Sequence, residues 1–293
     1  MRPRDRRRGR RCVGHPRAPP TPGGSGAAAS ACRFSLAHRT LRDNPVYIGT
    51  DLSRSVYNLL MLAVDKRELD LAALVAASLP GSHPRTVKFL TERARVQQTR
   101  VDDLIFRQGD EIPLTLMVRG HGAFRRTTVD GQQLVVGVAY PGEMFGVTSV
   151  SATISSVDLF TLTDGVVATW RGRDFRQAAE NDSGLALNVI DRMAMFLNLL
   201  TEKLDGFLHQ DARRRVIRVL ARYRDLFFAD PPVLTRTHLP GLVGTSREMT
   251  GRVLRGLECE GVVTRVGRAG LKLLDSQQLD SVAESLTDPG TKG

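Results

Sequence analysis

The chain has 293 residues, of which 41% are hydrophobic and 25% are charged, the composition of an ordinary globular protein of about two domains. No stretch approaches the roughly 20 consecutive apolar residues of a membrane helix, so we expect a soluble, cytoplasmic protein with no membrane partner. The three cysteines, Cys12, Cys32 and Cys259, form no CxxC pair, which predicts neither a zinc site nor a disulfide framework.

The net charge of +11 is unevenly distributed along the chain. Residues 1–42 contribute +10, because they hold eleven arginines, no lysine and the single acid Asp5. Residues 211–275 carry a further +6, so the rest of the chain is acidic overall. A basic module near the C-terminus of an otherwise acidic body is typical of a domain that faces phosphate.

Residues 1–50 are rich in Arg, Pro and Gly. Such a segment buries too little apolar surface to offset its chain entropy, so we expect it to be disordered. Two interpretations stay open. The segment is either a tail that binds nucleic acid nonspecifically or the product of a start codon assigned too early, since Met61 opens the part that reads as folded protein.

The next part of the chain predicts a β-roll sensor domain over residues 70–172. It begins with two helical stretches, at 69–76 and 86–93. Between 98 and 172, short apolar runs alternate with glycines or turn pairs, the pattern of an antiparallel barrel or jelly roll. The clearest strand-like runs are 114–118, 133–138 and 157–162.

A long helix is predicted over residues 173–209. Its apolar residues step by three and four positions, which is a heptad seam. Such a seam packs either against the chain's own body or against a second copy, and both readings stay open from periodicity alone. The seam residues are Ile190, Met193, Leu197, Leu200, Leu204 and Phe207.

After this helix, an amphipathic helix is predicted over 215–223, ending before the proline pair at 231–232 because proline cannot continue a helix. The loop around Phe227, Phe228 and Pro231 either contacts RNA polymerase or packs locally. Residues 276–293 are expected to form a C-terminal tail.

Residues 234–265 predict two short helices separated by a turn. Thr235 is expected to cap a first helix over 236–243, Gly244 to form the turn, and Thr245 or Ser246 to cap a second helix over 247–260. Residues 262–273 read as a β-hairpin that turns at 267–270. We expect an internal face of Leu239, Leu242, Val243, Val253, Leu254 and Leu257, and an exposed face of Arg247, Glu248, Thr250, Gly251, Arg252 and Arg255.

The exposed face has the chemistry of a DNA-reading helix. Arginine offers a bidentate fork to guanine O6 and N7, and glutamate accepts a hydrogen bond from cytosine N4. Cap residues and backbone amides at the helix start are suited to bind phosphate. The alternative is an amphipathic surface helix whose charges are only solvated.

The motif Ser-Arg-Glu-Met-Thr-Gly-Arg at 246–252 resembles the recognition helix of the Crp/Fnr family of transcription regulators. The resemblance extends over roughly 86–275 and implies an α+β fold. It places a β-roll (jelly-roll) of the cyclic-nucleotide-binding type over 70–172, a dimerisation helix over 173–209 and a winged helix-turn-helix over 211–275. It also favours the homodimer reading of the seam.

Carried over residue by residue, the resemblance implies that Arg247 and Arg252 contact guanines and that Glu248 contacts cytosine. Ser246, Thr245, Thr235 and Arg236 would lie at phosphates. The implied partner is double-stranded DNA with a palindromic site of GTGA-like half-sites about one helical turn apart. The middle of the first helix departs from the pattern, since Pro240 and Gly241 shorten or kink a regular helix.

The effector pocket implied by the resemblance consists of Gly142, Phe145, Gly146, Val147 and Thr201. Val147 stands where cyclic-AMP binders carry Glu, and residues 147–169 contain no Arg or Lys. We therefore expect weak or absent cyclic-AMP binding, and either a hydrophobic or neutral effector or none. No cofactor is predicted, because the cysteines form no iron–sulfur ligand set, although haem ligation by His121 or His209 stays open.

Two other function classes were weighed. An enzyme is disfavoured, since the sequence has no Gly-rich phosphate loop, no HExxH and no GxSxG motif. The other class is a regulatory or interaction protein that uses a cyclic-nucleotide-like β-roll without reading DNA. A DNA shift assay separates it from the transcription regulator.

Overall fold

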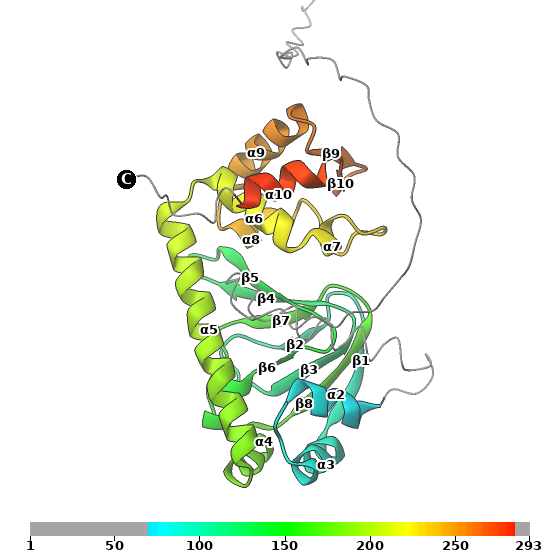
Figure 1. Cartoon of the computed structure of the whole chain (residues 1–293), viewed down its shortest axis with the longest axis vertical. Coiled ribbons are helices and arrows are strands. Elements are labelled where there is room, and N and C mark those ends of the chain that lie inside the picture. Colours follow the sequence, from blue (N-terminus) through cyan, green and yellow to red (C-terminus); the bar gives the residue numbers. More distant parts are fainter. Residues whose placement is uncertain (1–69, 285–293) are drawn as a thin grey trace, which may run out of the picture. The chain divides into compact units, whose positions relative to one another are not determined.

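The structure is a computed structural model that describes residues 70–284 (Figure 1). The chain divides into two units, Met1–Pro45 and Val46–Gly293. The first unit lies outside the described residues, as does the whole segment 1–50 expected to be disordered. Everything below concerns the second unit.

Two four-stranded antiparallel sheets form the β-roll, as the glycine-punctuated runs predict. One sheet has the order β1-β8-β3-β6 and the other the order β2-β7-β4-β5. The strands are β1 Arg95–Thr99, β2 Leu104–Phe106, β3 Leu114–Arg119, β4 Gly122–Thr127, β5 Gln133–Ala139, β6 Met144–Phe145, β7 Asp158–Thr161 and β8 Gly165–Trp170. The three predicted runs correspond to β3, β5 and β7.

Helices cover one side of this roll. Helix α2 (Leu71–Ser78), helix α3 (Pro84–Arg93) and the 3₁₀ helix η1 (Val147–Ser151) contribute to an outer core that includes Leu90, Trp170 and Phe175. The indole N–H of Trp170 donates to the Leu90 carbonyl at 2.6 Å. A separate inner core lies between the two sheets and consists of Phe106, Met117, Ala139, Leu159 and Val167.

The predicted single helix over 173–209 is wrong at its start. The chain forms α4 (Gly172–Glu180) and then α5 (Ser183–His209), with a break at Asn181–Asp182. The Asp182 carboxylate accepts from the backbone N–H groups of Gly184 and Leu185 at 3.0 and 3.2 Å. This capping begins a new helix and explains the break, because it satisfies N–H groups that a continuous helix would bond internally.

Helix α5 is attached to the β-roll at its N-terminal half (Figure 1). The Arg192 guanidinium donates to the carbonyls of Met144 in β6, at 3.0 Å, and of Ser78 in α2. By length and composition, Ser183–Gly206 is apolar enough to cross a membrane, and it is the one such helix among residues 70–284. The Arg192 guanidinium lies within this apolar stretch and bonds the backbone of the β-roll, so this side of α5 faces protein and not lipid.

The C-terminal part forms a third core around Phe227, Leu234 and Leu257. Its elements are α6 (Ala212–Arg222), α7 (Arg224–Phe227), α8 (Leu239–Val243), α9 (Arg247–Cys259), the hairpin β9 (Val263–Val266) and β10 (Gly270–Leu273), and α10 (Ser276–Glu284).

One expectation for this part is wrong, and of the two alternatives for the loop at Phe227 and Phe228 one agrees with the structure. The segment 276–293 is not simply a tail, because Leu279 of α10 is buried in the third core and Asp280 pairs with Arg224; residues 285–293 lie outside the described part. Phe227 is fully buried and Phe228 packs against the same core. Of the two alternatives for this loop, Phe227 and Phe228 therefore agree with local packing, and they give no support to a contact with RNA polymerase.

The cysteine expectation is not tested by the described residues: Cys259 is exposed at the end of α9, and Cys12 and Cys32 lie outside the described part. Among residues 70–284, no group of three or more His, Cys, Asp or Glu side chains is placed to hold a metal ion. His121 stacks edge-on against Tyr140 with ring centroids 5.5 Å apart, and exposed His209 faces Asp205 at 3.7 Å.

The β-roll and the C-terminal part share buried residues. Val138 and Tyr140, at the end of β5, belong to the third core, and the Tyr140 hydroxyl lies 3.3 Å from an Asp225 carboxylate oxygen.

Lys203 of α5 donates to the Val136 carbonyl of β5. Burial, reinforced by the positive charge of Arg222, lowers the pKa of Lys203 to about 8.

Replacing Lys203 by Met is expected to stabilise the protein at pH 7 by about 1–3 kcal/mol, because a buried charge is removed. The folded-state pKa lies below the ordinary 10.5, so the wild type should gain stability as the pH rises from about 8 to 10.5. Urea unfolding at pH 7 and pH 10, with exposed Lys272→Met as the control, measures both effects. A variant less stable at pH 7, with the wild-type pH dependence retained, contradicts this assignment.

Candidate nucleic-acid interface

The first helix of the predicted pair is shorter than expected. Helix α8 begins at Leu239, so Pro240 stands in its first turn, where the missing N–H breaks no helical hydrogen bond. This placement removes the conflict expected from a proline in mid-helix. Thr235 does not cap the helix, since His238 occupies that position. The Thr235 hydroxyl instead contacts the Thr237 hydroxyl at 2.7 Å and His238 Nδ1 at 3.2 Å.

The turn and the second cap form as predicted. Gly244 has φ +66°, a left-handed conformation that glycine adopts without steric cost. Thr245 is half-buried, and its N–H donates to the Pro240 carbonyl at 3.1 Å. Ser246 is the N-cap of α9, and its hydroxyl oxygen accepts from the Met249 N–H at 3.1 Å.

One face of α9 is buried in the third core, as the sequence predicts. Val253, Leu254 and Leu257 are each at most 9% exposed, and Leu239 and Val243 of α8 are buried beside them. Thr250 was expected on the exposed face but is only 2% exposed, because it lies three and four residues before Val253 and Leu254 and so on the same side of the helix; its hydroxyl donates to the Ser246 carbonyl at 3.0 Å.

The opposite face of α9 carries exposed charges. Arg247, Glu248, Arg252 and Arg255 are all exposed. Glu248 and Arg252 pair across one helical turn at 3.1 Å, with side chains 81% and 64% exposed. A pair this exposed stabilises the helix by little, so both groups remain available to a partner at low cost.

Beside α9 lies a cavity of about 290 Å³ lined by five arginines, namely Arg236, Arg247, Arg255, Arg265 and Arg268. Sequence reasoning assigned functions to Arg236 and Arg247 but missed Arg265 and Arg268 on the hairpin. The available signal was their position in the basic segment 211–275. The Arg236 guanidinium donates to the Arg268 carbonyl, and the Arg236 N–H donates to the Ala269 carbonyl at 2.9 Å. These bonds tie Arg236 to the hairpin turn.

The predicted seam on α5 is only partly exposed. Ile190, Leu197, Leu200 and Leu204 are exposed large apolar residues. Met193 is instead half-buried against the outer core, because α5 turns that side toward the roll; the Phe207 side chain lies outside what the structure describes. The exposed apolar stripe extends at both ends, to Leu187 and Leu208.

The predicted effector residues each have contacts within the fold. Gly142 (φ +80°) donates its N–H to the Met117 carbonyl at 2.7 Å. Gly146 (φ +79°) lies so close to Pro113 that a Cβ would stand 2.2 Å from its carbonyl oxygen. Val147 packs against the outer core. Thr201 is exposed on α5, and its hydroxyl donates to the Leu197 carbonyl at 3.0 Å.

The fifth effector residue, Phe145, points into the roll. It packs edge-on against Phe124 of β4 with ring centroids 5.0 Å apart and interplanar angle 87°, and both rings lie against the inner core. The sequence analysis missed Phe124. Only its register on β4 opposite Gly137 of β5 places it there, and a single sequence does not reveal that pairing.

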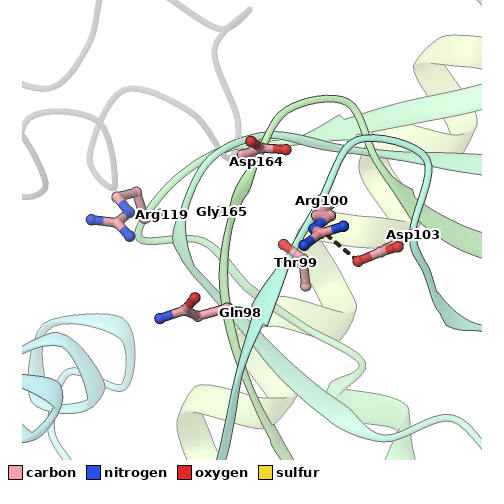
Figure 2. A pocket seen from close by; sticks show the side chains of 7 residues that line it. All are labelled: Gln98, Thr99, Arg100, Asp103, Arg119, Asp164 and Gly165. Atoms are coloured by element: carbon pink, nitrogen blue, oxygen red, sulfur yellow. Dashed lines mark hydrogen bonds between the residues drawn. The ribbon is translucent and has the colours of Figure 1, made fainter.

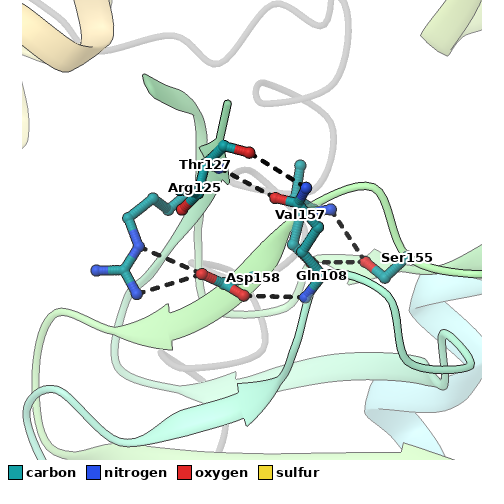
Figure 3. Close-up of polar contacts among 6 residues, drawn as sticks. All are labelled: Gln108, Arg125, Thr127, Ser155, Val157 and Asp158. Atoms are coloured by element: carbon teal, nitrogen blue, oxygen red, sulfur yellow. Dashed lines mark hydrogen bonds and ion pairs between the residues drawn. The ribbon is translucent and has the colours of Figure 1, made fainter. Parts of the chain in front are cut away.

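A network of hydrogen bonds lies around Asp158, at the start of β7 (Figure 3). Asp158 accepts from the Gln108 N–H at 2.9 Å and pairs with Arg125 of β4 at 3.3 Å. The Arg125 guanidinium also lies 4.9 Å from the centroid of the Phe160 ring. Asp158 is the one acid within residues 147–160, and it faces a cation, Arg125, from a neighbouring strand.

Comparisons with known proteins agree with this architecture. Residues 96–182 match the cyclic nucleotide-binding domain. The chain is 28% identical over 184 residues to the cyclic AMP receptor protein of Thermus thermophilus, covering 62% of this chain and 85% of that protein. It is 26% identical over 193 residues to the cAMP-activated global transcriptional regulator Vfr of Pseudomonas aeruginosa, covering 62% of this chain and 90% of Vfr.

Two solved structures share the fold. FixK2 from Bradyrhizobium japonicum superimposes with a TM-score of 0.54 at 21% identity, over 64% of this chain and 96% of FixK2. The c-di-GMP responsive global regulator CLP of Xanthomonas campestris gives a TM-score of 0.51 at 22% identity, over 66% of this chain and 100% of CLP.

The fold and the domain match define a protein with a β-roll of the cyclic-nucleotide-binding class. The two relatives support a Crp/Fnr-like regulator, and the solved structures show that the fold is shared. The relatives are a receptor and a transcriptional regulator, which supports a non-enzymatic role.

Replacing Ser246 by Ala is expected to destabilise the C-terminal part by about 1 kcal/mol, because the Met249 N–H loses its acceptor. Ser246→Asp keeps a capping oxygen and should retain most of the stability. Urea unfolding followed by far-UV circular dichroism compares the two variants. Equal stability of Ser246→Ala and the wild type would contradict the capping role.

Proposed function

We propose that this chain is a sequence-specific DNA-binding transcription regulator that acts as a homodimer and is not controlled by cyclic AMP. The observation that carries the proposal is the division of α9 into a buried apolar face and an exposed face with Arg247, Glu248 and Arg252. The cytoplasmic location expected from the sequence accords with this role.

The base-reading role rests on the chemistry of those three side chains. Two arginines suit guanine, and one glutamate suits cytosine N4, in a major groove that admits an α-helix. The Glu248–Arg252 pair holds both groups on one side of the helix, 3.1 Å apart. With the resemblance at 246–252, these contacts predict GTGA-like half-sites, and a two-fold symmetric dimer would require a palindrome.

Phosphate binding is assigned to the arginine-lined cavity and to the start of α9. Five guanidinium groups around one cavity would release counterions on meeting a phosphate backbone, so binding should weaken steeply with salt. The Ser246 hydroxyl accepts from Met249 and still has a proton to donate to phosphate. Arg236 also serves to hold the hairpin turn, where its guanidinium bonds the Arg268 carbonyl.

The dimer is assigned to the exposed stripe on α5. Ile190, Leu197 and Leu204 are 59%, 62% and 61% exposed and recur every seven residues, the period of a coiled-coil seam. Leaving such a stripe in water is costly, and a second α5 would bury it. A second copy also accounts for the apolar length of α5 without a bilayer.

Independence from cyclic AMP rests on how the roll is filled. Phe124 and Phe145 occupy the interior with their own rings, and Val147 offers no carboxylate to a ribose hydroxyl. Arg125 is already paired with Asp158, so a cyclic phosphate would have to compete with that carboxylate for the guanidinium. The relatives named above are linked to different nucleotides, cyclic AMP for Vfr and c-di-GMP for CLP, so the fold alone does not define an effector.

Replacing Arg252 by Ala is expected to weaken binding to a GTGA-containing palindrome by about 1–3 kcal/mol and to relax the preference at one base position per half-site. Electrophoretic shift titrations against a panel of single-base variants, at fixed salt, provide the measurement. Arg268→Ala is the matched control, and it should weaken all sequences about equally. If Arg252→Ala also lowers every affinity by the same factor, the base-reading assignment is wrong.

Replacing both Leu197 and Leu204 by Glu is expected to raise the dimer dissociation constant at least about 10-fold, because four buried charges would face one another across the seam. Analytical ultracentrifugation measures the change. Leu274→Glu, at an exposed apolar residue outside α5, is the control. An unchanged dimer in the double variant would contradict the assignment of the interface to this stripe.

A further inference from the structure

A cavity of about 580 Å³ lies at one end of the β-roll (Figure 2). Three chain segments meet there: the end of β1, the end of β3 and the turn that leads into β8. Its lining residues are Gln98, Thr99, Arg100, Asp103, Arg119, Asp164 and Gly165. The volume falls within the range of small-molecule sites.

This cavity is separate from the predicted effector residues. Strand β3 pairs with the cassette strand β6 at Thr115–Phe145, whereas the cavity lies at the opposite end of β3, beyond Arg119. At that end Thr99 of β1 pairs with Gly165 of β8. A molecule in the cavity would therefore contact none of Gly142, Phe145, Gly146 or Val147.

The two carboxylates of the lining have a role in the fold. Asp103 accepts from the Arg100 N–H at 2.7 Å, and Asp164 accepts from the Val101 N–H at 3.0 Å. Each bond fixes a turn and occupies one carboxylate oxygen. The other oxygen of each carboxylate has a remaining capacity to accept a hydrogen bond.

The hydrogen-bond donors among the lining side chains, unlike the two carboxylates, do not hold a turn in place. The side chains of Arg100, Arg119 and Gln98 form no hydrogen bond or ion pair with any residue in the described part of the chain. Figure 2 shows Arg119 and Arg100 on either side of the Gly165 backbone. Thr99 is only 4% exposed, and its buried hydroxyl has no hydrogen-bond partner. This hydroxyl is closed off from the cavity by its neighbours, so the exposed donors of Arg100, Arg119 and Gln98 are the groups that a ligand can reach.

We propose that this cavity binds a small metabolite carrying one oxyanion, a carboxylate or a phosphate, held by Arg119, with Arg100 across the Gly165 backbone on the other side of the cavity. Guanidinium groups suit both anions because their N–H donors form a planar fork. Hydroxyl or amine groups of the same molecule would donate to the remaining oxygens of Asp103 and Asp164. Two carboxylates in the wall oppose a polyanion, so DNA is not the occupant.

The test is isothermal titration of the full-length protein at low chloride with inorganic phosphate and, separately, with lactate, which carries one carboxylate and one hydroxyl. The expected result is saturable binding of at least one probe, with a dissociation constant of about 0.1–1 mM. The probe that binds more tightly distinguishes a phosphate-type from a carboxylate-type ligand. Failure of both to saturate below about 10 mM would overturn the proposal.

Variants locate the binding. Arg119→Ala should weaken binding at least about 10-fold, and Arg119→Lys, which keeps the charge but loses the fork, should weaken it by about 3- to 10-fold. Arg95→Ala is the matched control, because Arg95 is an exposed arginine at the other end of β1, and its effect should stay within about 2-fold. Equal losses in Arg95→Ala and Arg119→Ala would mean nonspecific charge attraction and would overturn the assignment.

A second readout does not depend on any variant. Amide chemical shifts of the wild type, recorded with and without the better probe, should change at Thr99 and Gly165 and stay constant at Gly146. The reverse pattern would place the ligand at the cassette and contradict a separate site.

Discussion

The burial of one face of α9 is the constraint on which the candidate interface depends. Val253, Leu254 and Leu257 pack into the third core, so the helix has one rotation about its axis that satisfies them. That rotation leaves Arg247, Glu248 and Arg252 in solvent. The cap at Ser246 and the left-handed turn at Gly244 then define where the helix starts. The reading face is thus a consequence of packing, and it is preorganised before any partner binds.

The interior of the β-roll is partly occupied by its own side chains. The rings of Phe124 and Phe145 pack edge-on, and Arg125 pairs with Asp158. The roll is also coupled to its neighbours. Arg192 bonds the backbone of β6 and α2 from α5, and Val138 and Tyr140 of β5 share the core of the C-terminal part. The roll is therefore in direct contact both with α5 and with the core that buries α9.

The sequence predicted those features that depend on local periodicity and special residues. The strands follow from glycine-separated apolar runs, and the Gly244 turn, the Ser246 cap and the buried face of α9 follow from residue type and spacing. The errors arise where a tertiary contact decides the outcome. Asp182, which also accepts from the distant His83 N–H, starts a new helix within the expected 173–209 helix, and Met193 packs on the roll. The Phe124–Phe145 contact depends on strand register, which a single sequence does not reveal.

Selection of binding sites from a random pool of DNA duplexes tests the central claim most directly, with the full-length protein at fixed moderate salt. The selection is run with and without cyclic AMP. The account predicts enrichment of a palindrome with GTGA-like half-sites in both selections, because α9 is preorganised and side chains of the roll itself occupy part of its interior. Enrichment only in the presence of cyclic AMP would contradict the account of the roll. Absence of any enriched sequence under both conditions would contradict DNA reading by α9.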